Sequence, residues 1–80
     1  MRIQEATVYR INELIKNSNL TPNGLSYVSG VPQATIKSIL NGESKNPGIT
    51  TIKKLCDGLD VSITDFFNNE VFNNLDQEFE

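Results

Sequence analysis

The chain of 80 residues contains no histidine, no tryptophan and one cysteine, Cys56. Without histidine the usual ligand sets for zinc and iron cannot be assembled, and neither a Ser-His nor a Cys-His nucleophile pair exists. A lone cysteine also excludes a disulfide within the chain. We therefore expect a protein that is not an enzyme and that uses no metal and no cofactor.

Long apolar runs are missing as well. A membrane-spanning helix needs about 18 consecutive apolar residues, and no such stretch is present. The N-terminus also lacks the charged-then-apolar pattern of an export signal. These absences predict a cytoplasmic protein with no membrane segment. A hydrophobic content of 38% is enough for one modest core, and therefore for one small domain.

Basic residues are outnumbered, with seven against ten acidic residues and a net charge of −3, which argues against a polyanionic partner. Their placement argues the other way. Residues 68–80 hold four acids and no base, whereas residues 21–54 hold four lysines against one glutamate. Four lysines over this span are also typical of an ordinary solvated surface, so charge alone leaves both interpretations open.

Apolar residues recur at three- and four-residue steps, which predicts an all-α bundle of about five short helices. The predicted helices cover residues 5 to 16 or 17, 22–29, 33–41, 49 to 58 or 60, and a short segment that Ser62 and Asp65 open. The expected core consists of the apolar residues on their inner faces: Val8, Ile11, Leu14, Ile15, Ile36, Ile39, Leu40, Ile49, Ile52, Leu55, Cys56, Leu59, Phe66 and Phe67.

Residues 21–42 are the most informative segment, because they predict two short helices joined by a tight turn. Small Ser26 allows the second helix to cross closely, Gly30 can take the positive φ that the turn needs, and Ile36 plugs the crossing. This order is typical of a helix-turn-helix. A start signal at Thr21 and a stop at Gly42 frame the motif.

Residues 1–67 are expected to form this domain, and residues 68–80 an acidic C-terminal extension. Four apolar residues spaced by four, from Phe67 to Phe79, allow one helical stripe that folds back on the domain or pairs with a second copy. A partly frayed acidic tail fits the composition equally well.

The sequence resembles the phage-repressor-like helix-turn-helix family, the Cro/C1 or XRE type of DNA-binding domain. The resemblance covers about residues 6–67 and is carried by three runs in order: LTPNGLSYVSGVPQATIKSILNG, KNP and LCDGLDVSITDFF. It implies a lambda-repressor-like bundle that is usually used as a homodimer on a pseudo-palindromic operator. Pro32 departs from the pattern, because the family commonly has a serine or threonine cap before the reading helix.

The helix expected at residues 33–41 would read the major groove from its polar side. The candidate base-reading residues are Gln33, Ala34, Lys37 and Ser38. Candidates for contacts to the DNA backbone are Thr21, Asn23, Thr35, Asn41, Lys45 and Asn46. The structural turn residues are Ser26, Gly30 and Ile36.

The favoured function is a sequence-specific regulator of transcription, a repressor, that binds double-stranded DNA. Two alternatives stay open. One is a protein-interaction module that kept the fold but lost DNA binding, which the acidic chain supports. The other is an antitoxin that binds DNA and covers a protein partner with its acidic tail.

Overall fold

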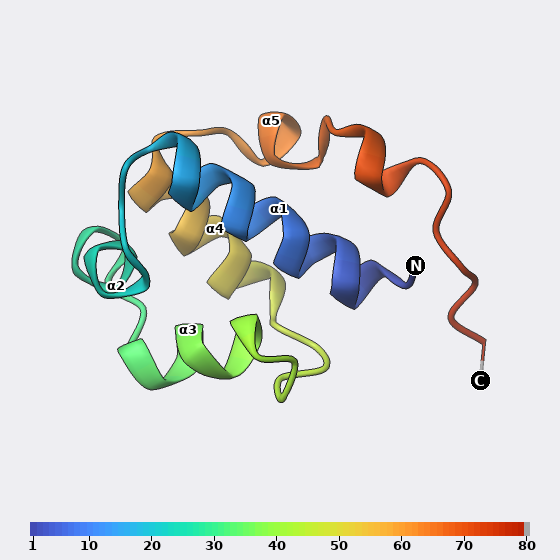
Figure 1. The fold of residues 1–80 in the computed structure, drawn as a ribbon, viewed down its shortest axis with the longest axis horizontal. Helices are drawn as coiled ribbons and strands as arrows, with labels where there is room; N and C mark the ends of the chain where they lie inside the picture. The colour runs from blue at the N-terminus through green and yellow to red at the C-terminus, as the bar shows by residue number, and fades with distance from the viewer. Residues whose placement is uncertain (80) are drawn as a thin grey trace.

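The computed structural model describes residues 1–79 and contains no strand among them (Figure 1). Its elements in chain order are α1 (Ile3–Asn17), α2 (Pro22–Ser29), α3 (Gln33–Leu40), α4 (Ile49–Leu59), α5 (Ile63–Phe67) and a 3-10 turn, η1 (Glu70–Phe72). The prediction of an all-α bundle of five short helices is therefore confirmed for this part of the chain. None of the helices described is long and apolar enough to cross a membrane.

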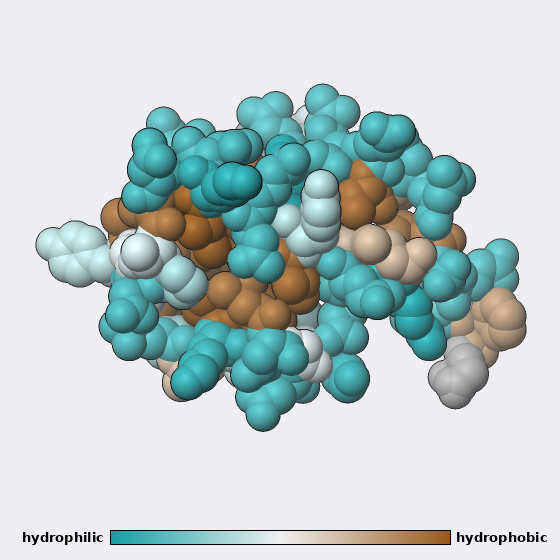
Figure 2. Space-filling model, in the orientation of Figure 1, coloured by the Kyte–Doolittle hydropathy of each residue, from teal (hydrophilic) through white to brown (hydrophobic). Residues whose placement is uncertain are grey.

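The bundle is organised around α2, which packs against both α3 and α4. The start of the bundle, α1, contacts α3 and η1, while α5 packs on α4. Figure 1 shows α3 along one side of the molecule, with α2 seen nearly end-on beside its first turn. Apolar side chains gather in the space between α1, α2 and α3, and hydrophilic side chains follow the outer side of α3 (Figure 2).

The helix ends differ slightly from the predicted ones. The first helix begins at Ile3 rather than near Glu5, because the Glu5 carboxylate accepts the backbone N–H of Arg2 at 3.0 Å and so satisfies an amide at the start of the helix. The third helix ends at Leu40, and Asn41 is its C-cap instead of its last residue. The second helix has the predicted bounds.

The core is close to the expected set, with four differences. Ile49 is 68% exposed, because it is the first residue of α4 and lies beyond the edge of the core. Val8, Leu40 and Phe67 are half-buried and pack against the core from its margin. Cys56 is fully buried, and this burial raises the pKa of its thiol, which therefore stays protonated at neutral pH.

The place of Arg10 opposite the apolar stripe of α1 suggests a solvated side chain. In the structure this side chain is half-buried instead. Its guanidinium donates to the carbonyl oxygens of Phe66 at 2.7 Å and Asp65 at 2.8 Å, and it pairs with Glu13 at 2.6 Å. Carbonyls at the end of a helix lack partners within the helix, so Arg10 satisfies those at the end of α5. This arginine therefore holds α1 to α5.

Gly58 lies inside α4 and does not end it. A Cβ at this position would fall 2.9 Å from both the Cα and the Cβ of Ser29, at the end of α2. The helix instead ends at Leu59, where Asp60 takes a left-handed conformation with φ of 58°. Glycine is therefore required at position 58 because two helices touch there.

The extension after α5 contains no α-helix between residues 68 and 79, so the stripe of apolar residues spaced by four does not form. Asn69 accepts the N–H of Val71 and starts the 3-10 turn η1, which places the ring of Phe72 5.0 Å from that of Phe67. Asparagine competes for nearby backbone groups and favours such turns over helix. The last described residues then return to the N-terminus, where the N–H of Asp76 donates to the carbonyl of Met1 at 3.0 Å.

We expect Gly58→Ala to lower the stability of the domain, because the added methyl must push α4 away from the backbone of Ser29. Overpacking of this kind costs about 1–3 kcal/mol, which exceeds the gain of about 1 kcal/mol from alanine's helix propensity. The measurement is the midpoint of thermal unfolding. Gly24→Ala is the matched control, because Gly24 is also helical but its nearest neighbour is the flexible side chain of Leu20 at 3.3 Å. Equal midpoints for the two variants would contradict the close approach.

Candidate nucleic-acid interface

The turn between α2 and α3 is built from three small residues. Gly30 ends α2 with φ of 75°, the left-handed conformation that a sharp reversal needs. Ser26 donates its hydroxyl to the carbonyl of Val31 at 2.6 Å, and Ser29 accepts the N–H of Val31 at 3.1 Å. The two serines therefore satisfy both backbone groups of Val31, whose side chain is buried. The sequence spacing predicted a small residue at position 26, but it did not predict the hydrogen bond from Ser26 to Val31.

The inner face of α3 is anchored in the core, and its outer face is open. Ile36 and Ile39 are each 1% exposed, whereas Gln33, Ala34, Thr35 and Lys37 are exposed. Since Pro32 provides no side-chain cap, the backbone amides of Gln33 and Ala34 have no acceptor within residues 1–79. The first turn of α3 therefore presents free N–H groups as well as side chains.

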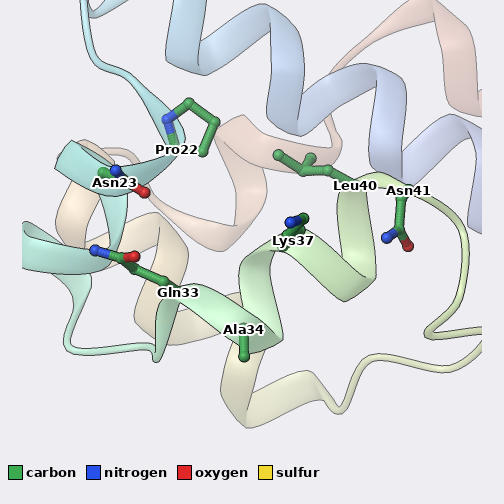
Figure 3. A pocket seen from close by; sticks show the side chains of 7 residues that line it. All are labelled: Pro22, Asn23, Gln33, Ala34, Lys37, Leu40 and Asn41. Carbon is green, nitrogen blue, oxygen red and sulfur yellow. The ribbon is translucent and has the colours of Figure 1, made fainter.

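A hollow of about 660 Å³ lies between the start of α2 and the outer face of α3 (Figure 3). Its lining residues are Pro22, Asn23, Gln33, Ala34, Lys37, Leu40 and Asn41. In Figure 3 Gln33 extends toward Asn23, while Ala34 points away from α2. The structure thus brings three of the candidate base-reading residues and two of the candidate backbone-contacting residues to one surface.

Within the part of the chain that the structure describes, the side chains of Gln33 and Lys37 have no hydrogen-bond or ion-pair partner. Their polar groups are therefore not engaged by the protein itself. Ser38 is half-buried, and its carbonyl accepts the N–H of Ser44 at 2.9 Å, which holds the loop that follows α3. Its position makes it less accessible than Gln33 and Lys37.

The candidate backbone-contacting residues lie on both sides of this hollow. Thr21 caps α2 by accepting the N–H of Gly24 at 3.0 Å, so the hydrogen of its hydroxyl is not used in that bond. At the other end, exposed Lys45 and Asn46 lie in the loop after α3, beside the start of α1. Gln4 donates its side-chain amide to the carbonyl of Gly42 at 3.1 Å and so holds this loop to α1.

Asn41 is a second candidate whose side chain is already engaged. Its amide donates to the carboxylate of Glu43 at 3.0 Å, and its oxygen accepts the backbone N–H of Glu43 at 3.0 Å. Glu43 thus takes one of the two amide hydrogens of Asn41, and a phosphate contact would use the other, beside a carboxylate. The sequence showed both residues but not this interaction, which depends on the conformation of the turn after α3.

Arg2 is the residue near the interface that the sequence did not indicate. It lines a second hollow together with Asn41, Gly42 and Lys45, although it is about 40 residues away in the sequence. Arg2 lies here because α1 packs against α3. This packing is a long-range contact, which no local sequence motif predicts. Arg2 therefore adds a basic group beside the C-terminal end of α3, close to Lys45 in the loop that follows.

The closely crossed α2 and α3, with the outer face of α3 left open, define the molecule as a helix-turn-helix domain. Residues 3–70 match the family of Cro/C1-type HTH DNA-binding domains, and the chain belongs to this family. The family is one of non-enzymatic DNA-binding domains, which confirms the expectation that the chain is not an enzyme.

The chain is also similar to the prophage Lp1 protein 11, whose crystal structure superposes with a TM-score of 0.80. The two are 37% identical, over 94% of this chain and the whole of that one. No curated protein matches the sequence.

We expect Ser26→Ala to destabilise the domain by about 1 kcal/mol, because it removes the partner of the Val31 carbonyl. A requirement for small size alone would predict no loss, since alanine is smaller than serine. Ser38→Ala is the control, because it makes the same change within a helix, at a hydroxyl with no partner among the described residues. The free energies of unfolding in urea give the comparison, and equal values would show that the hydroxyl of Ser26 does not stabilise the turn.

Proposed function

We propose that the protein is a sequence-specific regulator of transcription, acting as a repressor in the cytoplasm, that inserts α3 into the major groove of double-stranded DNA. The observation that carries this proposal is the open outer face of α3, where Gln33 and Lys37 are exposed and unengaged beside the start of α2. A helix fits the major groove, where each base pair presents a distinct pattern of donors and acceptors.

Each exposed side chain of α3 has a chemistry that suits this role. The amide of Gln33 can donate to and accept from adenine, and Lys37 can donate to guanine or to a phosphate. Ala34 points away from α2 and offers its methyl to the methyl of thymine. Ser38 can pair with several bases but reaches less far, because it is half-buried.

Contacts to the DNA backbone would come from both flanks of α3. At the start of α2, the hydroxyl of Thr21 and the amide of Asn23 can donate to phosphate oxygens. Beyond α3, Lys45 and Asn46 supply a charge and an amide. Thr35, exposed in the first turn of α3, and Asn41, at its C-cap, offer a hydroxyl and a further amide. The free amides at the start of α3 add the kind of donors that bind anions at helix N-termini.

The small number of basic groups leads us to propose a homodimer on DNA. Each phosphate that a protein neutralises adds to affinity and to its salt dependence, and this surface offers few lysines. Two copies on half-sites about 34 Å apart would double the contacts and would match a pseudo-palindromic operator.

The alternative of an acidic tail that binds a protein partner has less support. Two of the tail's carboxylates already lie on the protein's own N-terminus, where Asp76 is 3.8 Å from the terminal amine and Glu78 pairs with Arg2 at 2.8 Å. A partner would have to displace both contacts. This arrangement favours the DNA-binding regulator.

We expect Gln33→Ala to relax sequence preference and to cost about 1–3 kcal/mol on the best site, because a base-reading pair is lost. Lys45→Ala should instead weaken binding to all sequences alike and reduce the salt dependence by about one phosphate contact. Titrations of each variant on the selected site and on scrambled duplexes separate the two effects. A Gln33→Ala variant with unchanged preference would show that another face of α3 reads DNA.

Selection of bound duplexes from a random pool at two salt concentrations tests the proposed function itself. We expect an enriched sequence with two related half-sites, recovered more weakly at high salt. Glu70→Gln protein serves as the control for the effect of net charge, since Glu70 lies outside the proposed interface. A pool without any enriched sequence would contradict sequence-specific binding, and an enriched half-site alone would contradict the dimer.

A further inference from the structure

The N-terminal end of α1 places a basic side chain beside the proposed DNA-binding surface. Arg2 lines a hollow of about 650 Å³ with Asn41, Gly42 and Lys45, at the end of α3 that leads into the loop. The hydrogen bond from Gln4 to the carbonyl of Gly42 fixes this relation between α1 and the loop. Arg2 therefore belongs to the same flank as Lys45, where the proposed function places contacts to the DNA backbone.

In the folded chain this arginine is occupied by the C-terminal segment. The guanidinium of Arg2 donates to the two carboxylate oxygens of Glu78, at 2.8 Å from Nη2 and 3.2 Å from Nε. The same carboxylate accepts the N–H of Ile3 at 3.4 Å, and Asp76 lies 3.8 Å from the terminal amine of Met1. Two carboxylates thus cover both positive groups at the start of the chain.

The ion pair between Arg2 and Glu78 is well formed but open to solvent. Both side chains are 47% exposed. The hydrogen bond to Arg2 lowers the pKa of Glu78, and the same bond raises the pKa of Arg2, so both groups are charged near neutral pH. Exposed ion pairs are worth little, and an anion that approaches from solution can compete with Glu78 for Arg2.

We propose that Glu78 is an intramolecular competitor of DNA, which neutralises Arg2 in the free protein and releases it to a backbone phosphate when DNA binds. This inference rests on the proposed function and concerns its regulation. The carboxylate of Glu78 occupies donors of Arg2 that a phosphate would need, and both groups suit the planar donor set of arginine. The C-terminal segment therefore lowers the affinity for DNA in general, without affecting the choice of sequence.

The packing of the segment explains how this competition can be local. Phe72 is held by the rings of Phe66 and Phe67, and Asn69 donates to Glu13 at 3.0 Å. The part of the segment that follows Phe72 is tied to the rest of the chain by its contacts with Met1, Arg2 and Ile3. Release of Glu78 can therefore occur while the bundle stays folded.

The test compares Glu78→Gln with Glu70→Gln by titration of mixed-sequence double-stranded DNA at several salt concentrations. Both variants remove one negative charge from the segment, but only Glu78 contacts Arg2. We expect Glu78→Gln to bind DNA about two- to fivefold more tightly than Glu70→Gln at low salt, as the loss of an exposed ion pair predicts. Its salt dependence should be steeper by about one phosphate contact.

Arg2→Gln completes the test, alone and combined with Glu78→Gln. Because Arg2 is occupied in the parent, the double variant should lose the whole gain of Glu78→Gln, while Arg2→Gln alone should change affinity less than that gain. Equal affinities of Glu78→Gln and Glu70→Gln, or a gain that persists without Arg2, would overturn the inference. A parent protein that binds no DNA at all would instead overturn the proposed function, and the thermal midpoint of each variant shows that the bundle is intact.

Discussion

The close approach of α2 to α4 is the constraint on which the rest of the structure depends. Gly58 lies directly against the backbone of Ser29, at the last residue of α2, so no side chain separates the two helices there. That contact holds the end of α2 against α4, next to Gly30, whose left-handed conformation ends the helix and begins the turn. The turn, closed by Ser26 on Val31, then directs α3 outward with Ile36 and Ile39 in the core. The close contact at one glycine thereby helps to position the surface that we propose for DNA binding.

The charges of the molecule are arranged to suit this surface in spite of a net charge of −3. Arg10 is withdrawn into the packing of α1 on α5, and Arg2 is paired with Glu78 at the start of the chain. Lys37 and Lys45 are left exposed on and beside α3. A protein of this charge can meet a polyanion because α3 itself carries no acidic residue, while Lys37 is exposed on its outer face.

Much of the fold follows from local patterns, and the exceptions have clear causes. Periodicity and caps were sufficient for all five helices, because each buries one apolar stripe and begins or ends at a recognisable residue. Ile49 fits the period of α4 but is exposed, since a helix's first residue can lie beyond its neighbours. Gly58 resembled a helix end, because glycine in a sequence does not distinguish a cap from a close contact. The residues after Phe67 kept a spacing of four, yet asparagine side chains made a 3-10 turn there instead.

The candidate site shows the same division between local and long-range effects. The exposed face of α3, with Gln33 and Lys37, is a property of the order of residues along one helix, and it can be read directly from their spacing. The engagement of Arg2 by Glu78 could not be read in this way. That pair forms because the chain folds back on itself, and the distance between two side chains in space depends on every packing contact between them. Asn41 and Glu43 are only two residues apart, and their pairing depends on the conformation of the turn after α3. The order of residues along each helix determines which side chains it exposes. The packing of the whole bundle determines which of those side chains have a partner within the protein.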